Sequence, residues 1–362
     1  MAITTGDLIA RRSIDVLRGG QAPSGAFIAS PSFPTYRYAW LRDGAFCAHA
    51  LDLVGEAGAA AAFHGWVGRS IEAYRPMFES VIAQIAAGTP PPAEQMPPAR
   101  YTLDGSLEQP TDEPWPNFQV DGYGMWLWSL AEHMRLRGGM ADDWKETVDL
   151  VARYVSASWR LKSFSCWEEL DGGEHASTLG ATIAGLDAAA LLLDAPEWAE
   201  QADRVRASLF ERFVTNGRFV RGSTDDRLDG SLLWLGVPFG VLPLDDPRIT
   251  ATVEGIRREL LRPGGGVYRY LGDTYYGGGE WILLACSLAW HEARTGNLDA
   301  VEPLREWVRA TARPNGDLPE QVSGAAQEPQ MIAPWVARWG PVATPLLWSH
   351  AMYLIMEDAT RV

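Results

Sequence analysis

The sequence is poor in cysteine and in positive charge. Only three cysteines occur in 362 residues, Cys47, Cys166 and Cys286, too few and too scattered for the disulfide framework of a small secreted protein. Each stands beside apolar residues, so we expect reduced, buried thiols. Lys and Arg total 31 against 46 Asp and Glu, a formal net charge of -15. Such a chain repels nucleic acid and anionic lipid, which favours a neutral ligand.

Long apolar runs are also missing. Gly, Ser, His or Asp interrupts every apolar stretch before the roughly 18 residues that a membrane helix needs. The first residues carry Asp7 ahead of Arg11 and no apolar run of secretory length. We therefore expect no membrane segment, no signal peptide and a cytoplasmic location. With 47% hydrophobic and 21% charged residues, the composition predicts a compact globule.

Two kinds of helical segment alternate along the chain. One kind has apolar residues on a single face, and it occurs at 144–159, 198–213 and 247–260. The other is apolar almost all round, as helices buried on every side are, and it occurs at 178–193, 281–290 and 345–356. About six such pairs predict an all-α (α/α)6 barrel, in which buried helices form an inner ring and amphipathic helices an outer ring. We expect residues 1–362 to form this single domain.

The connecting segments show few strand patterns. A short hairpin is expected around 217–222, and the Pro-rich stretch 88–98 is too stiff for a helix and predicts a surface loop within the domain. The glycine runs at 264–266 and 277–279 lack the Lys and Ser of a phosphate-binding loop and follow no strand, so we interpret them as loop glycines.

Polar and aromatic residues gather just before the buried helices. In a barrel of helical hairpins these loops share one end, so together they would line one pocket with acids, arginines and aromatic rings, which suits a sugar. The clusters are Tyr36–Asp43, Trp115–Gly124, Trp167–Glu169, Arg269–Trp281 and Leu318–Gln321.

Two glutamates in these clusters suit glycoside hydrolysis, which needs one protonated and one ionised carboxyl. Glu168 is the candidate general acid, because burial beside Trp167 and Cys166 would raise its pKa, with like-charge repulsion from Glu169 acting in the same direction. Glu320 is the candidate base. Taken alone, Glu168 and Glu169 also fit an ordinary acidic pair at a helix start.

Other candidate residues have plain structural interpretations. Arg42 and Asp43 can form an ion pair at a helix start, and Ser349 can bond back to its own helix backbone. Most of the 16 tryptophans should be core. The six histidines, such as His49, His175 and His350, show no metal-ligand spacing, so neither a metal nor another cofactor is expected.

The motifs in these clusters resemble those of the glucoamylase family, glycoside hydrolase family 15, in the family's order and over nearly the whole chain. The matching motifs are Tyr-x-Tyr-x-Trp-x-Arg-Asp at 36–43, Trp-Glu-Glu at 167–169, Arg-Tyr-x-x-Asp-Thr-Tyr-Tyr at 269–276, Leu-Pro-Glu-Gln-Val at 318–322 and Ala-Thr-Pro-Leu-Leu-Trp-Ser-His at 343–350.

The resemblance implies a role for each matched residue. Glu168 would be the general acid and Glu320 the general base, with Ser349 hydrogen-bonded to the base. Glu169 would touch the leaving sugar, and Trp115 would cover the acid side. The remaining substrate-binding residues implied are Tyr36, Trp40, Arg42, Asp43, Trp167, Arg269, Tyr270 and Tyr275.

The first hypothesis is therefore an inverting exo-α-glucoside hydrolase that releases β-glucose from short α-1,4- or α-1,6-linked oligosaccharides. No starch-binding module is expected, which favours small saccharides. Trehalose hydrolysis is a variant of this class. A non-catalytic sugar-binding protein with the same barrel is a second hypothesis, although both carboxyls are present. A third, an epimerase or phosphorylase on this fold, calls for paired histidines or a phosphate pocket, and neither is evident. The sequence indicates no oligomeric state.

Overall fold

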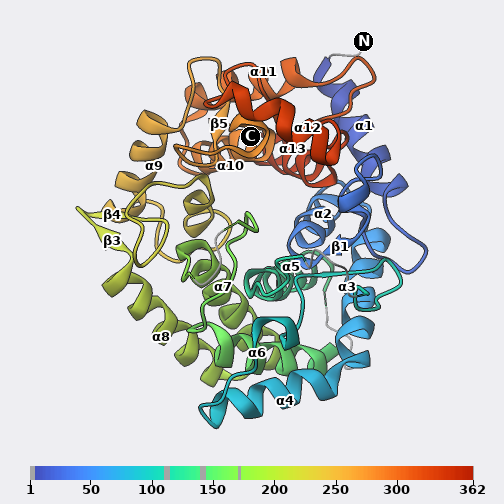
Figure 1. The fold of residues 1–362 in the computed structure, drawn as a ribbon, viewed down its shortest axis with the longest axis vertical. Helices are drawn as coiled ribbons and strands as arrows, with labels where there is room; N and C mark the ends of the chain where they lie inside the picture. The colour runs from blue at the N-terminus through green and yellow to red at the C-terminus, as the bar shows by residue number, and fades with distance from the viewer. Residues whose placement is uncertain (1–4, 110–114, 139–143, 170–172, 362) are drawn as a thin grey trace.

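The computed structural model describes residues 5–109, 115–138, 144–169 and 173–361. Within these ranges the chain closes into a ring of helices (Figure 1). The inner ring consists of α2 (Leu41–Leu53), α5 (Asp121–Arg137), α7 (Ala176–Leu193), the 3-10 helix η4 (Gly230–Leu235), α10 (Ile282–Arg294) and α13 (Leu347–Ala359). Each element contacts the next, and α13 contacts α2, so the inner ring is closed.

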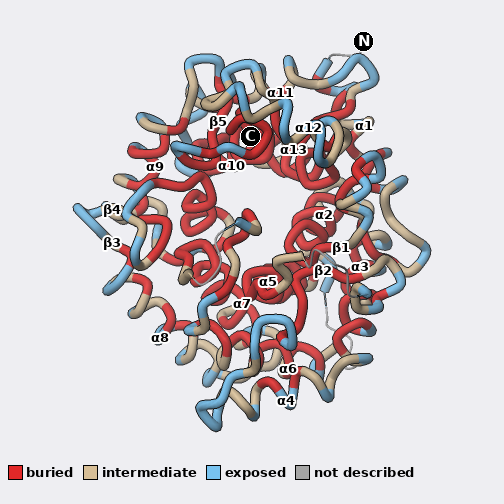
Figure 2. Tube along the Cα trace, in the orientation of Figure 1, coloured by how far each residue is buried: buried red, intermediate tan, exposed pale blue. Residues whose placement is uncertain are grey.

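An outer helix packs against each inner element. The outer ring consists of α1 (Thr5–Gly19), α3 (Ala57–Ala73), α6 (Lys145–Ser158), α8 (Pro196–Arg212), α9 (Pro247–Glu259) and α11 (Leu298–Thr311), with α4 (Arg75–Ala86) packed on α6. Outer and inner elements alternate along the chain, which confirms the predicted (α/α)6 barrel. Buried residues concentrate in the inner elements and exposed residues around the outside (Figure 2).

The helices form where their residue patterns predicted them. The one-sided segments fold as α6, α8 and α9, and the Asp246 carboxylate caps α9 by accepting from the backbone N–H of Arg248 at 2.9 Å. The all-apolar segments fold as α7, α10 and α13. By length and composition α7 could cross a membrane, but 72% of it is buried inside the protein. It is therefore accounted for as a core helix of the inner ring.

The fourth inner position is shorter than the others. It is a six-residue 3-10 helix rather than a full α-helix. Gly236 and Pro238 follow it, and proline has no N–H with which to continue a helix. Asp229 caps its start by accepting from the backbone N–H of Ser231 at 2.8 Å.

Short antiparallel strands fix the loops at one end of the barrel. β1 (Ala39–Trp40) pairs with β2 (Arg100–Tyr101), and β5 (Val267–Tyr268), β6 (Glu280–Trp281) and β7 (Gln321–Val322) form a three-stranded sheet. β3 (Val214–Thr215) and β4 (Arg218–Phe219) form a hairpin, which lies three residues earlier than the hairpin expected around 217–222. The remaining elements are α12 (Ile332–Trp339) and the 3-10 helices η1 (Pro34–Tyr36), η2 (Ala93–Gln95), η5 (Tyr275–Gly277) and η6 (Pro329–Met331).

The cysteines agree with the sequence prediction, and the Pro-rich segment agrees with it in part. The three cysteines are free and buried, as predicted. The Pro-rich segment is largely exposed from 88 to 95, but residues 96–98 are buried as they lead into β2. The surface loop is thus shorter than the sequence indicated, because Pro98 packs inside, where its carbonyl accepts from Tyr123 Oη at 2.8 Å.

Candidate active site

A pocket of about 690 Å³ lies at the end of the barrel where the inner helices begin. Its volume is within the range of roughly 300–1,000 Å³ that is typical of small-molecule sites. Residues from all five predicted clusters line it, which confirms that these loops converge.

Glu168 is held in a strained loop immediately before α7. Its φ of 65° lies in the left-handed region, which costs a non-glycine residue on the order of 1–3 kcal/mol and is concentrated at functional sites. Oε1 accepts from Trp40 Nε1 at 2.5 Å, Gln119 Nε2 at 3.0 Å and Arg42 Nη2 at 3.4 Å. Trp167 and Cys166 line the pocket beside Glu168 as expected, but three nitrogen donors from other loops, which the sequence did not indicate, converge on this oxygen.

Arg42 is a buried cation at the start of α2. Its Nη1 donates to Gln119 Oε1 at 2.7 Å and to Asp121 Oδ2 at 3.0 Å, so it joins α2 to α5. Burial alone would lower the pKa of Arg42, but Asp121, Glu168 and Asp43 raise it above its usual range. Burial raises the pKa of Asp43 to about 7, although Arg42 opposes the shift. Arg42 is thus permanently charged, and Asp43 can change protonation near neutral pH.

Glu320 lies immediately before β7 and is 3% exposed. Its Oε1 accepts from Tyr36 Oη at 3.0 Å, while Oε2 has no hydrogen-bond partner among the described residues. Burial raises the pKa of Glu320 to about 8, against the hydrogen bond from Tyr36 and the charge of Arg269. A carboxylate that titrates near neutrality is a stronger base than an ordinary surface glutamate.

Arg269 is the second buried cation of the pocket. Its Nη2 lies 2.6 Å from Asp273 Oδ1 and 2.5 Å from Glu169 Oε1, and Tyr270 Oη donates to Glu169 Oε2. Burial would lower the pKa of Arg269, but Asp273 and Glu169 raise it well above its usual range. Glu169 is therefore fixed by two partners at the pocket wall.

Trp167 is anchored from behind by residues that the sequence interpretation did not select. Its Nε1 donates to Asp229 at 3.0 Å, and Arg221 Nε lies 3.2 Å from Asp229 Oδ2 in a buried ion pair. The Arg221 guanidinium also lies 3.8 Å from the ring centre of Tyr270. Asp229 thus positions Trp167, and Arg221 lies against Tyr270, which donates to Glu169. In the sequence, a charged side chain beside apolar neighbours is the feature that could have indicated Asp229 and Arg221 as buried residues.

Aromatic rings form much of the pocket wall. Trp40 contacts Tyr36 and Trp115 edge-on, and the Trp115 and Trp339 ring centres are 6.1 Å apart. Trp339 belongs to α12, which also supplies Trp335 and Arg338 to the pocket. The sequence interpretation missed α12, although two tryptophans four residues apart in Trp-Val-Ala-Arg-Trp are typical of one helix face.

The pocket brings together most of the predicted site residues. Those that line it are Tyr36, Trp40, Arg42, Asp43, Trp115, Trp167, Glu168, Glu169, Arg269, Tyr275 and Glu320. Tyr270 acts from outside the lining, through Glu169. The predicted bond from Ser349 to the base is wrong, because the single hydroxyl proton of Ser349 is donated to the carbonyl oxygen of Pro319, the residue before Glu320, at 2.8 Å. It thus positions the base through the backbone. It does not bond back to its own helix either.

The chain matches the family model described as glycosyl hydrolases family 15 over residues 6–327. The chain belongs to this family. It is 40% identical over 358 residues to isomaltose glucohydrolase of Kribbella flavida, which covers 97% of this chain and 92% of that protein. Trehalase 2 of Sulfolobus acidocaldarius is 28% identical over 296 residues, 72% of this chain and 49% of that protein.

Solved structures agree with this membership. A glycosidase variant in complex with glucose has a TM-score of 0.93 and 38% identity, covering 98% of this chain and 97% of that one. A bacterial glucoamylase complexed with acarbose shares the fold, with a TM-score of 0.75 and 20% identity over 97% of this chain and 55% of that one. The family 15 protein described here is thus a glycoside hydrolase of the glucoamylase type.

Proposed function

We propose that this family 15 enzyme releases β-glucose from the non-reducing end of isomaltose and other short α-glucosides, with inversion at the anomeric carbon. The observation that carries the proposal is the pairing of Glu168 and Glu320 in one pocket. Oε1 of each carboxylate accepts hydrogen bonds, and Oε2 of Glu320 has no hydrogen-bond partner among the described residues.

The two carboxyls divide the chemistry between them. Glu168 Oε1 is occupied by nitrogen donors, so its transferable proton sits on Oε2 and passes to the leaving glycosidic oxygen. Glu320 Oε1 is held by Tyr36, so Oε2 accepts a proton from the water that attacks the anomeric carbon. Water attack on the face opposite the leaving group gives inversion.

The polar wall between them suits one glucose ring. Arg42 and Asp43 come from the start of α2, and Arg269 comes from the loop after β5, so charged groups approach the pocket from separate directions. Buried, pre-oriented charges of this kind bind sugar hydroxyls without further reorganisation. The aromatic faces of Trp40 and Trp115 supply apolar contact area for the rings.

The preference for isomaltose rests on two supports. The relative with 40% identity along nearly the full length of both chains is an isomaltose glucohydrolase. In addition, α12 places Trp335, Arg338 and Trp339 on the pocket wall. A walled pocket favours a short ligand over an extended polymer.

The test is proton NMR of the sugar released from isomaltose, maltose and trehalose in parallel during the first minutes of reaction. Early β-glucose from isomaltose, at a higher kcat/KM than for maltose, is the expected result. Early α-glucose from isomaltose would overturn inversion, and turnover of trehalose alone would replace the substrate assignment.

A matched pair of variants ties the activity to the pocket. Glu320→Gln should abolish turnover, while Glu328→Gln, on the same connection but outside the pocket lining, should leave it unchanged. An active Glu320→Gln enzyme would contradict the assigned base.

A further inference from the structure

A second cluster of polar residues lies far from the pocket. Asp52 and His133 occur near the ends of α2 and α5, whose first residues face the active site. At about 1.5 Å per residue, these positions lie roughly 17 Å further along the barrel. His64 comes from the outer helix α3. The three side chains therefore join two inner helices to an outer one.

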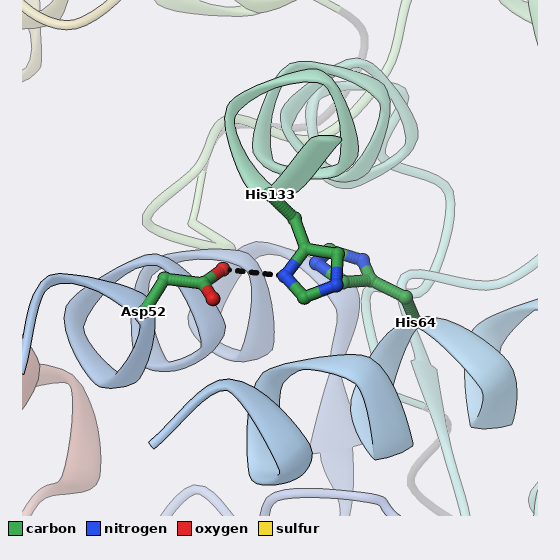
Figure 3. Close-up of side chains that lie close together, drawn as sticks. All are labelled: Asp52, His64 and His133. Carbon is green, nitrogen blue, oxygen red and sulfur yellow. Dashed lines mark hydrogen bonds and ion pairs between the residues drawn. The ribbon is translucent and has the colours of Figure 1, made fainter. Parts of the chain in front are cut away.

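The geometry of this cluster is compact. One ligand atom from each of Asp52, His64 and His133 can be chosen so that all lie within 4.8 Å of one another. His133 Nδ1 is 2.7 Å from Asp52 Oδ2, and the His64 and His133 ring centres are 5.1 Å apart. Figure 3 shows the two rings beside each other and the carboxylate turned toward them.

His64 is the unexplained member. Its side chain is completely buried, yet neither ring nitrogen has a hydrogen-bond partner among the described residues. Buried polar groups are normally paired, because losing water without a replacement partner is unfavourable. A neutral imidazole carries one N–H donor and one lone pair, so both nitrogens of His64 lack the partner that buried polar atoms normally have.

We propose that Asp52, His64 and His133 form a binding site for one divalent ion of the zinc type. Two imidazole nitrogens and one carboxylate oxygen are a donor set that zinc accepts, whereas calcium and magnesium prefer oxygen alone. Tetrahedral bonds of about 2.0–2.1 Å separate the ligand atoms by roughly 3.3 Å. The present 2.7 Å contact between His133 Nδ1 and Asp52 Oδ2 therefore needs to open by roughly 0.6 Å, and the ligand atom of His64, which lies within 4.8 Å of the other two, needs to approach the ion.

The neighbouring cation Arg137 leaves one oxygen of the Asp52 carboxylate for the ion. Arg137 Nε lies 3.2 Å from Asp52 Oδ1, so it occupies the oxygen that His133 does not use. The Trp144 ring lies 6.1 Å from His64 and provides an apolar neighbour. Arg137 lowers the affinity by its charge but also orients Asp52, in the manner of an outer partner of a metal ligand.

The ion at this site stabilises the barrel and takes no part in catalysis. Asp52, His64 and His133 do not line the active-site pocket, and an ion that holds α2, α3 and α5 together favours the folded state by mass action. The three residues are 12 and 69 positions apart in the chain, which is why no sequence spacing indicated a site.

The test uses the full chain freed of metal with a chelator, then titrated with ZnCl2 by calorimetry and followed by thermal unfolding. One equivalent of bound zinc, a raised Tm and unchanged kcat for the glucoside are expected. His64→Gln should weaken zinc binding on the order of 100-fold. The matched control His291→Gln changes another buried histidine with an unpartnered nitrogen and should keep wild-type binding.

Cobalt provides a readout that does not depend on how well the variant folds. Wild-type protein with Co²⁺ should show the intense visible absorption of a four-coordinate site. Weak six-coordinate absorption, less than a tenth of an equivalent of zinc, or equal binding by His64→Gln would overturn the proposal. Displacement of the ion by glucose would also overturn it, because it would place the metal on the catalytic carboxyls.

Discussion

Tyr36 Oη donates to Oε1 of Glu320 at 3.0 Å, a contact that joins the N-terminal loop of the barrel to its C-terminal part. The same hydroxyl lies 2.8 Å from Tyr275 Oη. Burial raises the pKa of Tyr36 well above its usual value, and the charge of Glu320 acts in the same direction. Tyr36 therefore stays protonated and fixes one oxygen of the base, which leaves the other oriented for water.

Tyr36→Phe should lower kcat roughly 10- to 100-fold with a smaller change in KM, because the variant loses the orientation of the base more than the binding of sugar. Steady-state kinetics with isomaltose measure the change. Tyr154→Phe is the control, since the buried Tyr154 hydroxyl has no hydrogen-bond partner among the described residues. Equal losses in the two variants would mean that packing, and not the bond to Glu320, is responsible.

Glu320→Gln should make the protein more stable at high pH. Burial raises the pKa of Glu320 from 4.5 to about 8 in the folded state, so the folded chain holds a proton that the unfolded chain releases in this window. The free energy of unfolding of the wild type should therefore fall as pH rises from about 4.5 to 8, by up to about 1.4 kcal/mol per pH unit from this group.

Urea unfolding at several pH values measures this difference. The advantage of Glu320→Gln over wild type should grow with pH through that window and level off above it. Glu328→Gln should show no such trend. A constant difference between Glu320→Gln and wild type at all pH values would show that Glu320 does not titrate there.

Asp229→Asn should reduce kcat/KM about tenfold, because the carboxylate that accepts from Trp167 Nε1 and pairs with Arg221 loses its charge. Trp167 adjoins Glu168, so the general acid shifts with it. Asp225→Asn removes a charge from the same segment, but Asp225 pairs with Arg227 nearer the surface. An equal loss of kcat/KM in Asp225→Asn would show that the effect does not depend on the contact between Asp229 and Trp167.

Trp339→Ala should raise KM for isomaltose about five- to tenfold with little change in kcat, since a lost aromatic contact weakens substrate and transition state alike. Val336→Ala lies on the exposed side of the same helix, where Val336 is 42% exposed and does not line the pocket. It should leave both constants unchanged. An unaltered KM in Trp339→Ala would show that α12 does not contribute to sugar binding.

The helices of this barrel could be predicted because each is encoded by its own residues. The one-sided pattern of α9 and its Asp246-Pro247 start are local features, as is the all-apolar stretch of α7. The fourth inner element, η4, is shorter than the other five, because Gly236 and Pro238 end it after six residues. The surface loop predicted at 88–98 is too long, because the burial of Pro98 depends on Tyr123, which is distant in sequence.

The sequence by itself determined the helix faces, the caps and the residue types of the candidate site, because these depend on near neighbours in the chain. Only the tertiary structure decided that three nitrogen donors meet at Glu168, that Ser349 holds Pro319, and that His64 lies beside Asp52 and His133. Burial and hydrogen-bond partners set the protonation of each group, and both come from segments far apart in the chain.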